Sequence, residues 1–532
     1  MKEIIKILPK KLYILSFIIG IIYSLADYGE SISLGYFGTS PLTIEKIVGL
    51  AICIVLVDIA MLISAKFGSY IDNINEIKTK TVIEQFYFKK LQEMTMKQIT
   101  NTHTGYIHKL ISNYSKYFFD MTWFFGFSVL PLIVGGISIL IMVCQQSLIT
   151  GIICIVISFL AVYFKSKMIK NKQPYQKRTN EEESKYNATF VDFIQNIIAV
   201  RKLNISEFCN KKINENTDSF LKVAKINEKK RSVTNAVFTG LMNLLYIVVL
   251  ISTIIMVKNG QDGLPYLLFY MSALGKLYHN LNSLVRFIDI KEKTKTAKKQ
   301  LDEYFKDNKN IRLIKNFNNL KLSNVLFSYS PKSTKIKIPE FILHKGEKIS
   351  IMGESGQGKS TVMNILSGLY PLENGDLLIN NRKQKNARLD LVFVSQEVDL
   401  FDLTIRENLC LGKNISEKKI MNLIEEAGLM DWYEELPNGL DTRIGEKGIK
   451  LSAGQRQRLN LIRGILIDKE LYFFDEPTSN LDIISEEKII NMIDKYLHDK
   501  TYVIITHRPK LKELCNRNYI FEDHMMKEVI KV

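Results

Sequence analysis

The sequence predicts two parts with different fold classes: a membrane α-helical bundle in residues 1–312 and an α/β domain in residues 313–532. Three observations lead to this division. Apolar runs of membrane length occur only in the first part, and the excess of basic residues is confined to it as well. The second part alternates short strand-like runs with helical patterns, which is typical of βαβ units on a mainly parallel sheet.

The charge distribution separates the two parts. The chain of 532 residues has 72 Lys and Arg against 55 Asp and Glu, a net charge of +17. Residues 1–315 hold 41 basic and 24 acidic side chains, whereas residues 316–532 hold 31 of each. Basic charge spread along a domain would favour a nucleic-acid partner. Because the excess accompanies the apolar runs, it favours a membrane face instead, and no nucleic-acid binding is predicted.

Six apolar runs of the first part are long enough to cross a bilayer, because about 20 helical residues span a hydrocarbon core of about 30 Å. These runs predict a bundle of six transmembrane helices. They cover residues 12–34, 43–65, 121–144, 147–164, 235–257 and 264–288.

The basic residues between these runs predict the orientation. Residues 66–117 contain eight Lys, and residues 165–231 contain sixteen Lys or Arg, whereas the other connections contain only Lys258. Both long loops should therefore lie in the cytoplasm, with the N-terminus and the second domain, in a multi-pass protein of the cytoplasmic membrane. Apolar spacing within the loops predicts that each is a helical extension, a turn and a return helix.

The second domain carries a phosphate-binding motif. Residues 353–361 fit the P-loop pattern, between a predicted strand at 348–352 and a predicted helix at 361–369. Glycines let consecutive N–H groups point at phosphate oxygens, and the helix N-terminus favours an anion. Lys359 would reach the terminal phosphates of ATP, and Ser360 would ligate Mg²⁺. The alternative is a glycine-rich turn that matches by chance. The predicted nucleotide-binding residues of this motif are Gly353, Glu354, Ser355, Gly356, Gln357, Gly358, Lys359, Ser360 and Thr361.

A second motif ends a predicted apolar strand at residues 471–474 with two carboxylates, Asp475 and Glu476. Asp475 would hold Mg²⁺, and Glu476 would polarise the attacking water. A plain turn after a strand is the alternative. With the P-loop, the pair predicts an α/β P-loop NTPase domain that binds ATP and Mg²⁺.

Residues 451–455, Leu-Ser-Ala-Gly-Gln, resemble the signature sequence of ATP-binding cassette (ABC) proteins, with Ala453 where the family commonly has glycine. Six spans with two long cytosolic loops followed by a cassette resemble an ABC exporter half-transporter over essentially the whole chain. Residues 104–107 also resemble a coupling-helix region, and residues 442–448 resemble the exporter X-loop, except at Arg443.

The resemblance implies roles for further residues. Tyr329 matches the aromatic residue that stacks on adenine, and Asp482 matches the D-loop. Gln396 matches the Q-loop, which implies a catalytic and metal-binding role, and His507 matches the switch histidine that contacts the γ-phosphate.

The resemblance also implies a dimer, because the family site combines the P-loop of one cassette with the signature of another. Ser452, Gly454 and Gln455 of a second half-transporter would then complete each of two composite sites. Since Glu476 and His507 are both present, a homodimer is favoured, and a heterodimer stays open. A non-transport regulatory ATPase and an importer are the alternatives. Intact hydrolytic residues disfavour the regulator, and the fused spans disfavour the importer.

Three polar residues within the predicted spans are candidates for cargo binding: Asp58, Lys276 and His279. A carboxylate in an apolar run is costly unless it faces a cavity or a polar partner. Lys276 and His279 lie one helical turn apart, which favours a shared face. Structural pairing between helices is the alternative for all three.

Groups of both signs favour a small modified peptide, or a peptide-like natural product, as the exported cargo. A multidrug or lipid exporter is the alternative, with membrane lipid as a further partner. About eleven residues precede the first predicted span, so no N-terminal peptidase domain is expected, and the peptide would be processed before export.

Overall fold

The computed structural model of the chain describes residues 6–37, 43–94, 99, 104–129, 132–259, 263–306, 312–329, 333–372, 374–384, 387–445, 448 and 450–529. The chain forms two compact units. One comprises residues 1–92 and 102–307, and the other comprises residues 93–101 and 308–532.

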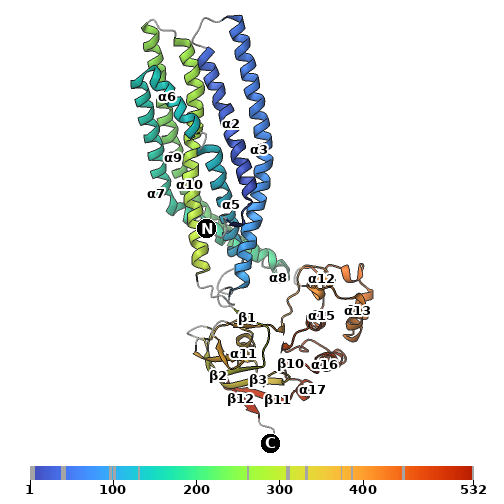
Figure 1. Cartoon of the computed structure of the whole chain (residues 1–532). Helices are drawn as coiled ribbons and strands as arrows, with labels where there is room; N and C mark the ends of the chain where they lie inside the picture. Colours follow the sequence, from blue (N-terminus) through green and yellow to red (C-terminus); the bar gives the residue numbers. More distant parts are fainter. Residues whose placement is uncertain are drawn as a thin grey trace. The chain divides into compact units, whose positions relative to one another are not determined.

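The first unit is helical throughout its described residues, and several of its helices run side by side along most of their length (Figure 1). Its elements are α2 (Lys10–Phe37), α3 (Ile44–Gln92), α5 (Thr104–Phe124), η1 (Phe125–Val129), η2 (Leu132–Gly136), α6 (Ile137–Gln146), α7 (Leu148–Gln195), α8 (Ile197–Lys202), α9 (Ser206–Lys258) and α10 (Gly263–Tyr304).

The long helices are longer than a bilayer requires. Helix α3 has 49 residues and α9 has 53, so at 1.5 Å per residue each is more than twice as long as a hydrocarbon core is thick. Helices α7 and α9 are joined by a short turn around α8. The prediction that the second long loop is a helical extension, a turn and a return helix is confirmed.

Three described helices, α3, α7 and α9, are long and apolar enough to cross a membrane by length and composition. The other predicted spans lie in α2, in α10 and in the segment from α5 to α6. That last segment is interrupted by the π-helical turns η1 and η2. Many large apolar side chains of the spans point outward, such as Leu56 at 60% and Leu62 at 70% exposed. A helix that is apolar on its outer face suits a lipid surrounding rather than water.

The second unit combines a sheet with helices (Figure 1). Its strands are β1 (Arg312–Ile314), β2 (Asn319–Phe327), β3 (Ile336–His344), β4 (Lys348–Gly353), β5 (Asn374–Ile379), β6 (Arg382–Gln384), β7 (Ala387–Leu389), β8 (Val392–Val394), β9 (Leu471–Asp475), β10 (Thr501–Ile505), β11 (Arg517–Glu522) and β12 (Met525–Val529). Its helices are α11 (Lys359–Leu366), α12 (Ile405–Cys410), α13 (Glu417–Glu426), α14 (Met430–Glu434), η3 (Gly439–Asp441), α15 (Ala453–Ile467), α16 (Ile483–Leu497) and α17 (Pro509–Glu513).

Ten strands form one sheet in the order β6-β5-β2-β3-β12-β11-β4-β10-β9-β8, and β1 pairs with β7 separately. The pairs from β11 through β4, β10 and β9 to β8 are parallel. This block contains the predicted strands at 348–352 and 471–474. The expectation of a mainly parallel sheet is wrong for the other side, where β2 pairs antiparallel with both β3 and β5. Hairpins join β2 to β3 and β5 to β6, so these antiparallel pairs need no crossover helix.

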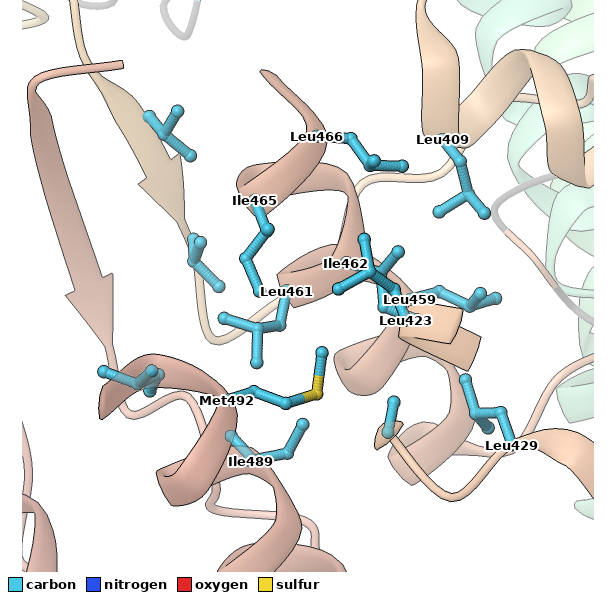
Figure 2. Packing of buried hydrophobic residues seen from close by; sticks show 14 of the residues in the cluster. Leu409, Leu423, Leu429, Leu459, Leu461, Ile462, Ile465, Leu466, Ile489 and Met492 are labelled. Atoms are coloured by element: carbon cyan, nitrogen blue, oxygen red, sulfur yellow. The ribbon is translucent and has the colours of Figure 1, made fainter. Parts of the chain in front are cut away.

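The parallel block brings the carboxyl ends of β4, β9 and β10 to one edge, where the loops that follow these strands meet. Helix α15 is fixed by its apolar surface. Figure 2 shows Leu459 and Ile462 of α15 near Leu423, and Leu461 on the side of the α16 residue Met492. Because α15 is packed against both neighbours, its N-terminus has a defined position.

Candidate active site

The loop between β4 and α11 is held in a conformation that glycine adopts most freely. Gly353 has a φ of 139° and Gly358 a φ of 115°. A Cβ on Gly353 would lie 2.7 Å from the carbonyl oxygen of Phe521, and a Cβ on Gly358 would lie 2.7 Å from the Ile336 side chain. Neighbouring chain segments therefore close on both ends of the loop and exclude larger residues.

The loop presents N–H groups without acceptors. Among the described residues, no hydrogen-bond acceptor is found for the N–H groups of Gly356, Gly358 and Ser360. Ser360 stands in the first turn of α11, where backbone donors lack an intrahelical partner. Because Glu354, Ser355 and Gly356 are exposed, an anion can approach from solvent. This arrangement fits the phosphates of ATP.

Lys359 is buried beside the loop, with 7% of its surface exposed. Its ammonium donates hydrogen bonds to the carbonyl oxygens of Gly353 and Glu354, the second at 2.9 Å. Burial lowers the pKa of Lys359, while the carboxylates of Glu476 and Asp475 raise it. The lysine is therefore held by the loop, next to the predicted metal ligand Asp475 and the predicted catalytic residue Glu476.

Asp475 ends β9, a strand whose residues are all buried. Burial raises the pKa of Asp475, whereas the neighbouring Ser360 hydroxyl lowers it. Hydroxyl and carboxylate oxygens are the ligands that Mg²⁺ prefers. Because Ser360 and Asp475 lie side by side at the phosphate loop, the two residues fit a Mg²⁺ ion.

Glu476 has a backbone conformation that is rare for a residue with a Cβ, with a φ of 49°. Its N–H donates to the carbonyl oxygen of Ile505 at 3.0 Å. Glu476 Oε2 accepts a hydrogen bond from the Gln396 amide at 3.2 Å, and Glu476 Oε1 lies 3.7 Å from His507 Nε2. His507 Nε2 lies 3.3 Å from Lys359 Nζ. The structure thus brings all three predicted catalytic residues, Gln396, Glu476 and His507, together at the phosphate loop.

Tyr329 is tied to the first turn of α11 by its hydroxyl, which donates to Thr361 Oγ1 at 3.0 Å. Its ring meets Tyr370 edge-on, with 5.1 Å between centroids, and 46% of the residue is exposed. An anchored aromatic ring with an open side is suited to stacking on a flat base. On the other side of the loop, the side-chain oxygen of Gln357 accepts the His524 N–H at 2.9 Å.

The predicted signature residues contact their own helix instead of the phosphate loop. Ser452 caps α15: its hydroxyl accepts the Gln455 N–H at 3.1 Å, and the Gln455 side chain accepts the Ser452 N–H at 2.8 Å. A Cβ on Gly454 would lie 3.3 Å from the Asn480 carbonyl oxygen. Asp482 caps α16 by accepting the Ser485 N–H at 2.9 Å, and this bond lowers the pKa of Asp482. No described contact joins these residues to Lys359.

Sequence reasoning missed Gln457, which connects α15 to the catalytic glutamate. Gln457 is 1% exposed. Its amide donates to the Glu476 carbonyl oxygen at 2.8 Å, and its side-chain oxygen accepts the Asn480 N–H at 3.2 Å. Gln457 lies one turn before Leu461 and two before Ile465 on the apolar face of α15. A single amide side chain among the apolar residues of this helix face is the sequence signal that could have identified Gln457 as a residue with a buried polar partner.

The exporter-type X-loop is described only in part, because Glu446 and Lys447 lie outside the described residues. Arg443 forms an isolated antiparallel bridge with Thr404, the residue that caps α12. The basic residue at this position is therefore accommodated at the edge of the cassette's helices.

The three candidate cargo residues are not gathered in one place. Asp58 is exposed on α3, and His279 is exposed on α10. Lys276 is partly buried, and its ammonium lies 3.3 Å from Asp27 Oδ1 of α2 and also donates to the Asp27 carbonyl oxygen. The structure thus pairs Lys276 with a residue that sequence reasoning overlooked, and Lys276 and His279 differ in exposure.

Two family models match the chain: the ABC transporter transmembrane region over residues 12–274 and the ABC transporter domain over residues 336–479. The chain belongs to the ABC transporter family. One membrane region and one cassette in the same chain are the layout of a half-transporter, so this resemblance is confirmed, and so are the helical and P-loop fold classes of its two parts.

The chain is similar in sequence to several known proteins. The chain is 27% identical to the mitochondrial iron-sulfur clusters transporter of Kluyveromyces lactis over 69% of this chain and 53% of that protein. It is 36% identical to the ATP-dependent lipid A-core flippase of Photobacterium profundum over 38% of this chain and 36% of that protein. An uncharacterised ABC transporter ATP-binding protein of Bacillus subtilis is 25% identical over 81% of this chain and 77% of its own length. The first two matches thus span about half or less of the relatives' length.

A solved structure of a bacterial Atm1-family ABC exporter with ATP bound has the same fold. It superposes with a TM-score of 0.80 over 97% of this chain and 93% of the other, at 21% identity. At this identity the likeness concerns the fold.

Proposed function

We propose that two copies of this ABC transporter chain form an ATP-driven exporter with two composite ATP sites. The observation that carries the proposal is the division of the site within one chain. Gln396, Glu476 and His507 lie within hydrogen-bond or ion-pair distance of one another or of Lys359, whereas Ser452 caps its own helix. A chain that holds the hydrolytic half of a site and presents the signature half elsewhere needs a second copy to complete it.

The residues at the phosphate loop support ATP hydrolysis. Mg²⁺, when held by Ser360 and Asp475, would neutralise charge on the phosphates. Glu476 orients and polarises the attacking water, since its carboxylate is fixed by Gln396 on one oxygen and faces His507 on the other. His507 and Lys359 place positive or hydrogen-bonding groups where charge develops on the transferred phosphoryl group.

The same proposal includes a homodimer with the cassettes and the N-terminus in the cytoplasm. Intact hydrolytic residues support two equal sites. The basic residues of the long helical extensions support the orientation.

For the cargo, we propose a lipid or another small amphiphile in place of the peptide that the sequence favoured. A peptide cargo is favoured if Asp58, Lys276 and His279 bind it together, but Lys276 is paired with Asp27. Two relatives are named for iron-sulfur clusters and for lipid A, and those names support the non-peptide alternative.

Turnover of the full chain in lipid nanodiscs tests the ATPase proposal. Glu476→Gln should lower the ATPase rate by roughly 10²-fold or more, because a positioned general base contributes about 10²–10⁴-fold, while a fluorescent ATP analogue still binds. An unchanged rate in this variant, or no turnover in the wild type under any condition, contradicts the proposal and favours a regulatory cassette.

A cargo panel separates the substrate classes. Lipids, cationic dyes and processed peptides are compared for stimulation of the wild-type ATPase rate, with Glu476→Gln as the blank. Stimulation by peptides alone would overturn the amphiphile proposal and restore the peptide interpretation.

A further inference from the structure

A cavity of about 750 Å³ lies among α5, α7 and α10 of the membrane unit. Its volume is within the range of about 300–1,000 Å³ that is usual for small-molecule sites. Its lining is rich in basic residues, with six lysines against three carboxylates. The lysines are Lys109, Lys170, Lys172, Lys177, Lys185 and Lys293.

Ion pairs neutralise only some of these charges. Lys293 lies 2.8 Å from Asp289, and Lys185 lies 2.8 Å from Glu182. Lys177 approaches Glu181 at 3.9 Å, and Lys109 approaches Glu183 at 3.5 Å. Within the described part of the chain, Lys170 and Lys172 form no ion pair. The cavity therefore keeps an excess of positive charge.

Lys109 of α5 adds a separate observation. Its Nζ is shielded from water and makes no hydrogen bond within the described residues, and the nearest carboxylate oxygen, on Glu183, lies 3.5 Å away. This ion pair supplies charge but no hydrogen bond, and a shielded ammonium that makes no hydrogen bond is energetically costly. An anion in the adjoining cavity would supply the missing acceptor.

The position of the cavity favours a soluble ligand. Lys109 lies twelve residues before the predicted span at 121–144, which is roughly 18 Å along a helix. Bilayer headgroups extend only about 5–8 Å beyond the hydrocarbon core. The far end of the cavity is thus beyond the reach of a lipid headgroup.

We propose that this cavity binds a soluble polyanion of metabolite size, held by Lys109, Lys170 and Lys172. Polar neighbours support the assignment, since Asn113 and Gln173 add amide donors to the lining. The lysines act as point charges, so phosphate and carboxylate groups are both accepted.

Occupancy of the cavity would also regulate turnover. The helices around it continue into predicted spans, and an anion between Lys109 of α5 and the lysines Lys170 and Lys172 of α7 attracts both helices. The bound anion draws the helix ends together. This regulatory consequence rests on the proposed ATPase function, whereas the binding itself does not.

Calorimetric titration with tripolyphosphate tests the binding. The full chain is placed in nanodiscs of neutral lipid, and every sample in this titration also carries Lys359→Gln so that the P-loop does not bind tripolyphosphate. The wild type should show saturable binding that weakens as salt is raised. Lys109→Gln, Lys170→Gln and Lys172→Gln should each weaken it about tenfold, the effect of one charged hydrogen bond.

Lys167→Gln is the matched control, because Lys167 is exposed on the same helix and does not line the cavity. Equal loss in this control, or no saturable binding in the wild type, overturns the proposal. So does tripolyphosphate binding that is lost when the nanodiscs contain anionic lipid, since a headgroup would then occupy the cavity.

The ATPase rate with and without tripolyphosphate separates the two proposals. If the wild type binds the anion but never hydrolyses ATP, the exporter proposal fails and the anion site stands. If ATP is hydrolysed at a rate that the anion changes equally in wild type and Lys109→Gln, the regulatory role of this cavity is wrong.

Discussion

The cassette and the membrane unit use their polar residues in opposite ways. In the cassette, Lys359, Gln396, Glu476 and His507 come from separate segments and converge on one loop. In the membrane unit, polar residues join helices in pairs, as when Lys276 contacts Asp27. Another example is Asp72 of α3, which accepts hydrogen bonds from Ser16 of α2 and from Trp123 of α5.

This difference shows why a polar residue supports an inference about chemistry in the cassette and an inference about helix packing in the membrane unit. Convergence of several titratable groups on one place is a sign of chemistry. A polar pair between apolar helices satisfies groups that lipid leaves without partners, so it is first a sign of packing. Nucleotide chemistry can therefore be inferred from the cassette motifs, whereas cargo chemistry cannot be inferred from isolated charges in the spans.

The largest expected effect tests how far ATP binding by the cassette depends on the glycines of the loop between β4 and α11. Gly358→Ala should lower ATP affinity by about 10- to 100-fold, because the new Cβ meets Ile336 at 2.7 Å at a positive φ, and such a forced shift costs about 1–3 kcal/mol. Binding of a fluorescent ATP analogue measures it. Gly412→Ala is the control, since Gly412 also has a positive φ but its Cβ meets nothing within 4 Å. Equal loss of affinity in both variants would mean that the close approach is unimportant.

The second prediction concerns Gln457 as a positioning residue for Glu476. Gln457→Glu keeps the acceptor for Asn480 but loses the amide that donates to the Glu476 carbonyl oxygen. The kcat should fall about tenfold, the effect of roughly 1.4 kcal/mol, with the KM for ATP nearly unchanged.

The pH profile distinguishes positioning from simple destabilisation. When the introduced carboxyl group is protonated it can donate again, so the ratio of variant to wild-type kcat should rise as pH falls. Gln457→Met has no donor at any pH and should show a constant ratio. A rising ratio in Gln457→Met, or an increase in KM alone, contradicts this role.

The third prediction tests the pairing interpretation in the membrane unit. Lys276→Met and Asp27→Asn should each destabilise the protein by about 1–3 kcal/mol, because each removes the opposite charge from a half-buried ion pair. The double variant should recover part of the loss. Thermal unfolding in nanodiscs measures the cycle. If Lys276→Met instead alters cargo stimulation and leaves unfolding unchanged, Lys276 is a cargo residue as first predicted.

The smallest effect is expected from Asp475→Asn, which should stabilise the nucleotide-free protein at neutral pH by about 1 kcal/mol. Burial raises the pKa of Asp475 above its ordinary value, so the folded state binds this proton more tightly than the unfolded state. The cost of the ionised carboxylate therefore grows as pH rises through the folded pKa. The gain in unfolding temperature should disappear at acidic pH, and Mg²⁺-dependent turnover should be lost. A gain that persists at acidic pH would contradict this cause.

Much of the cassette could be predicted because its motifs are local. The P-loop and the Asp475–Glu476 strand end carry their chemistry in a few adjacent residues, and the structure places them together at one sheet edge. The antiparallel half of the sheet was not predicted, since β2 pairs with β5 across a large separation in sequence. The sequence of a short alternating strand does not indicate which other strand it pairs with.

The sequence by itself determined the two fold classes, the long helical extensions and the residues of the phosphate loop, because apolar run length and glycine spacing are local constraints on a chain. Only the tertiary structure decided that Gln457 supports Glu476, that Lys276 pairs with Asp27 and that Ser452 caps its own helix. Each of these depends on which distant segments meet. A side chain's role follows from the partners that burial gives it, and those partners are set by the packing of the whole unit.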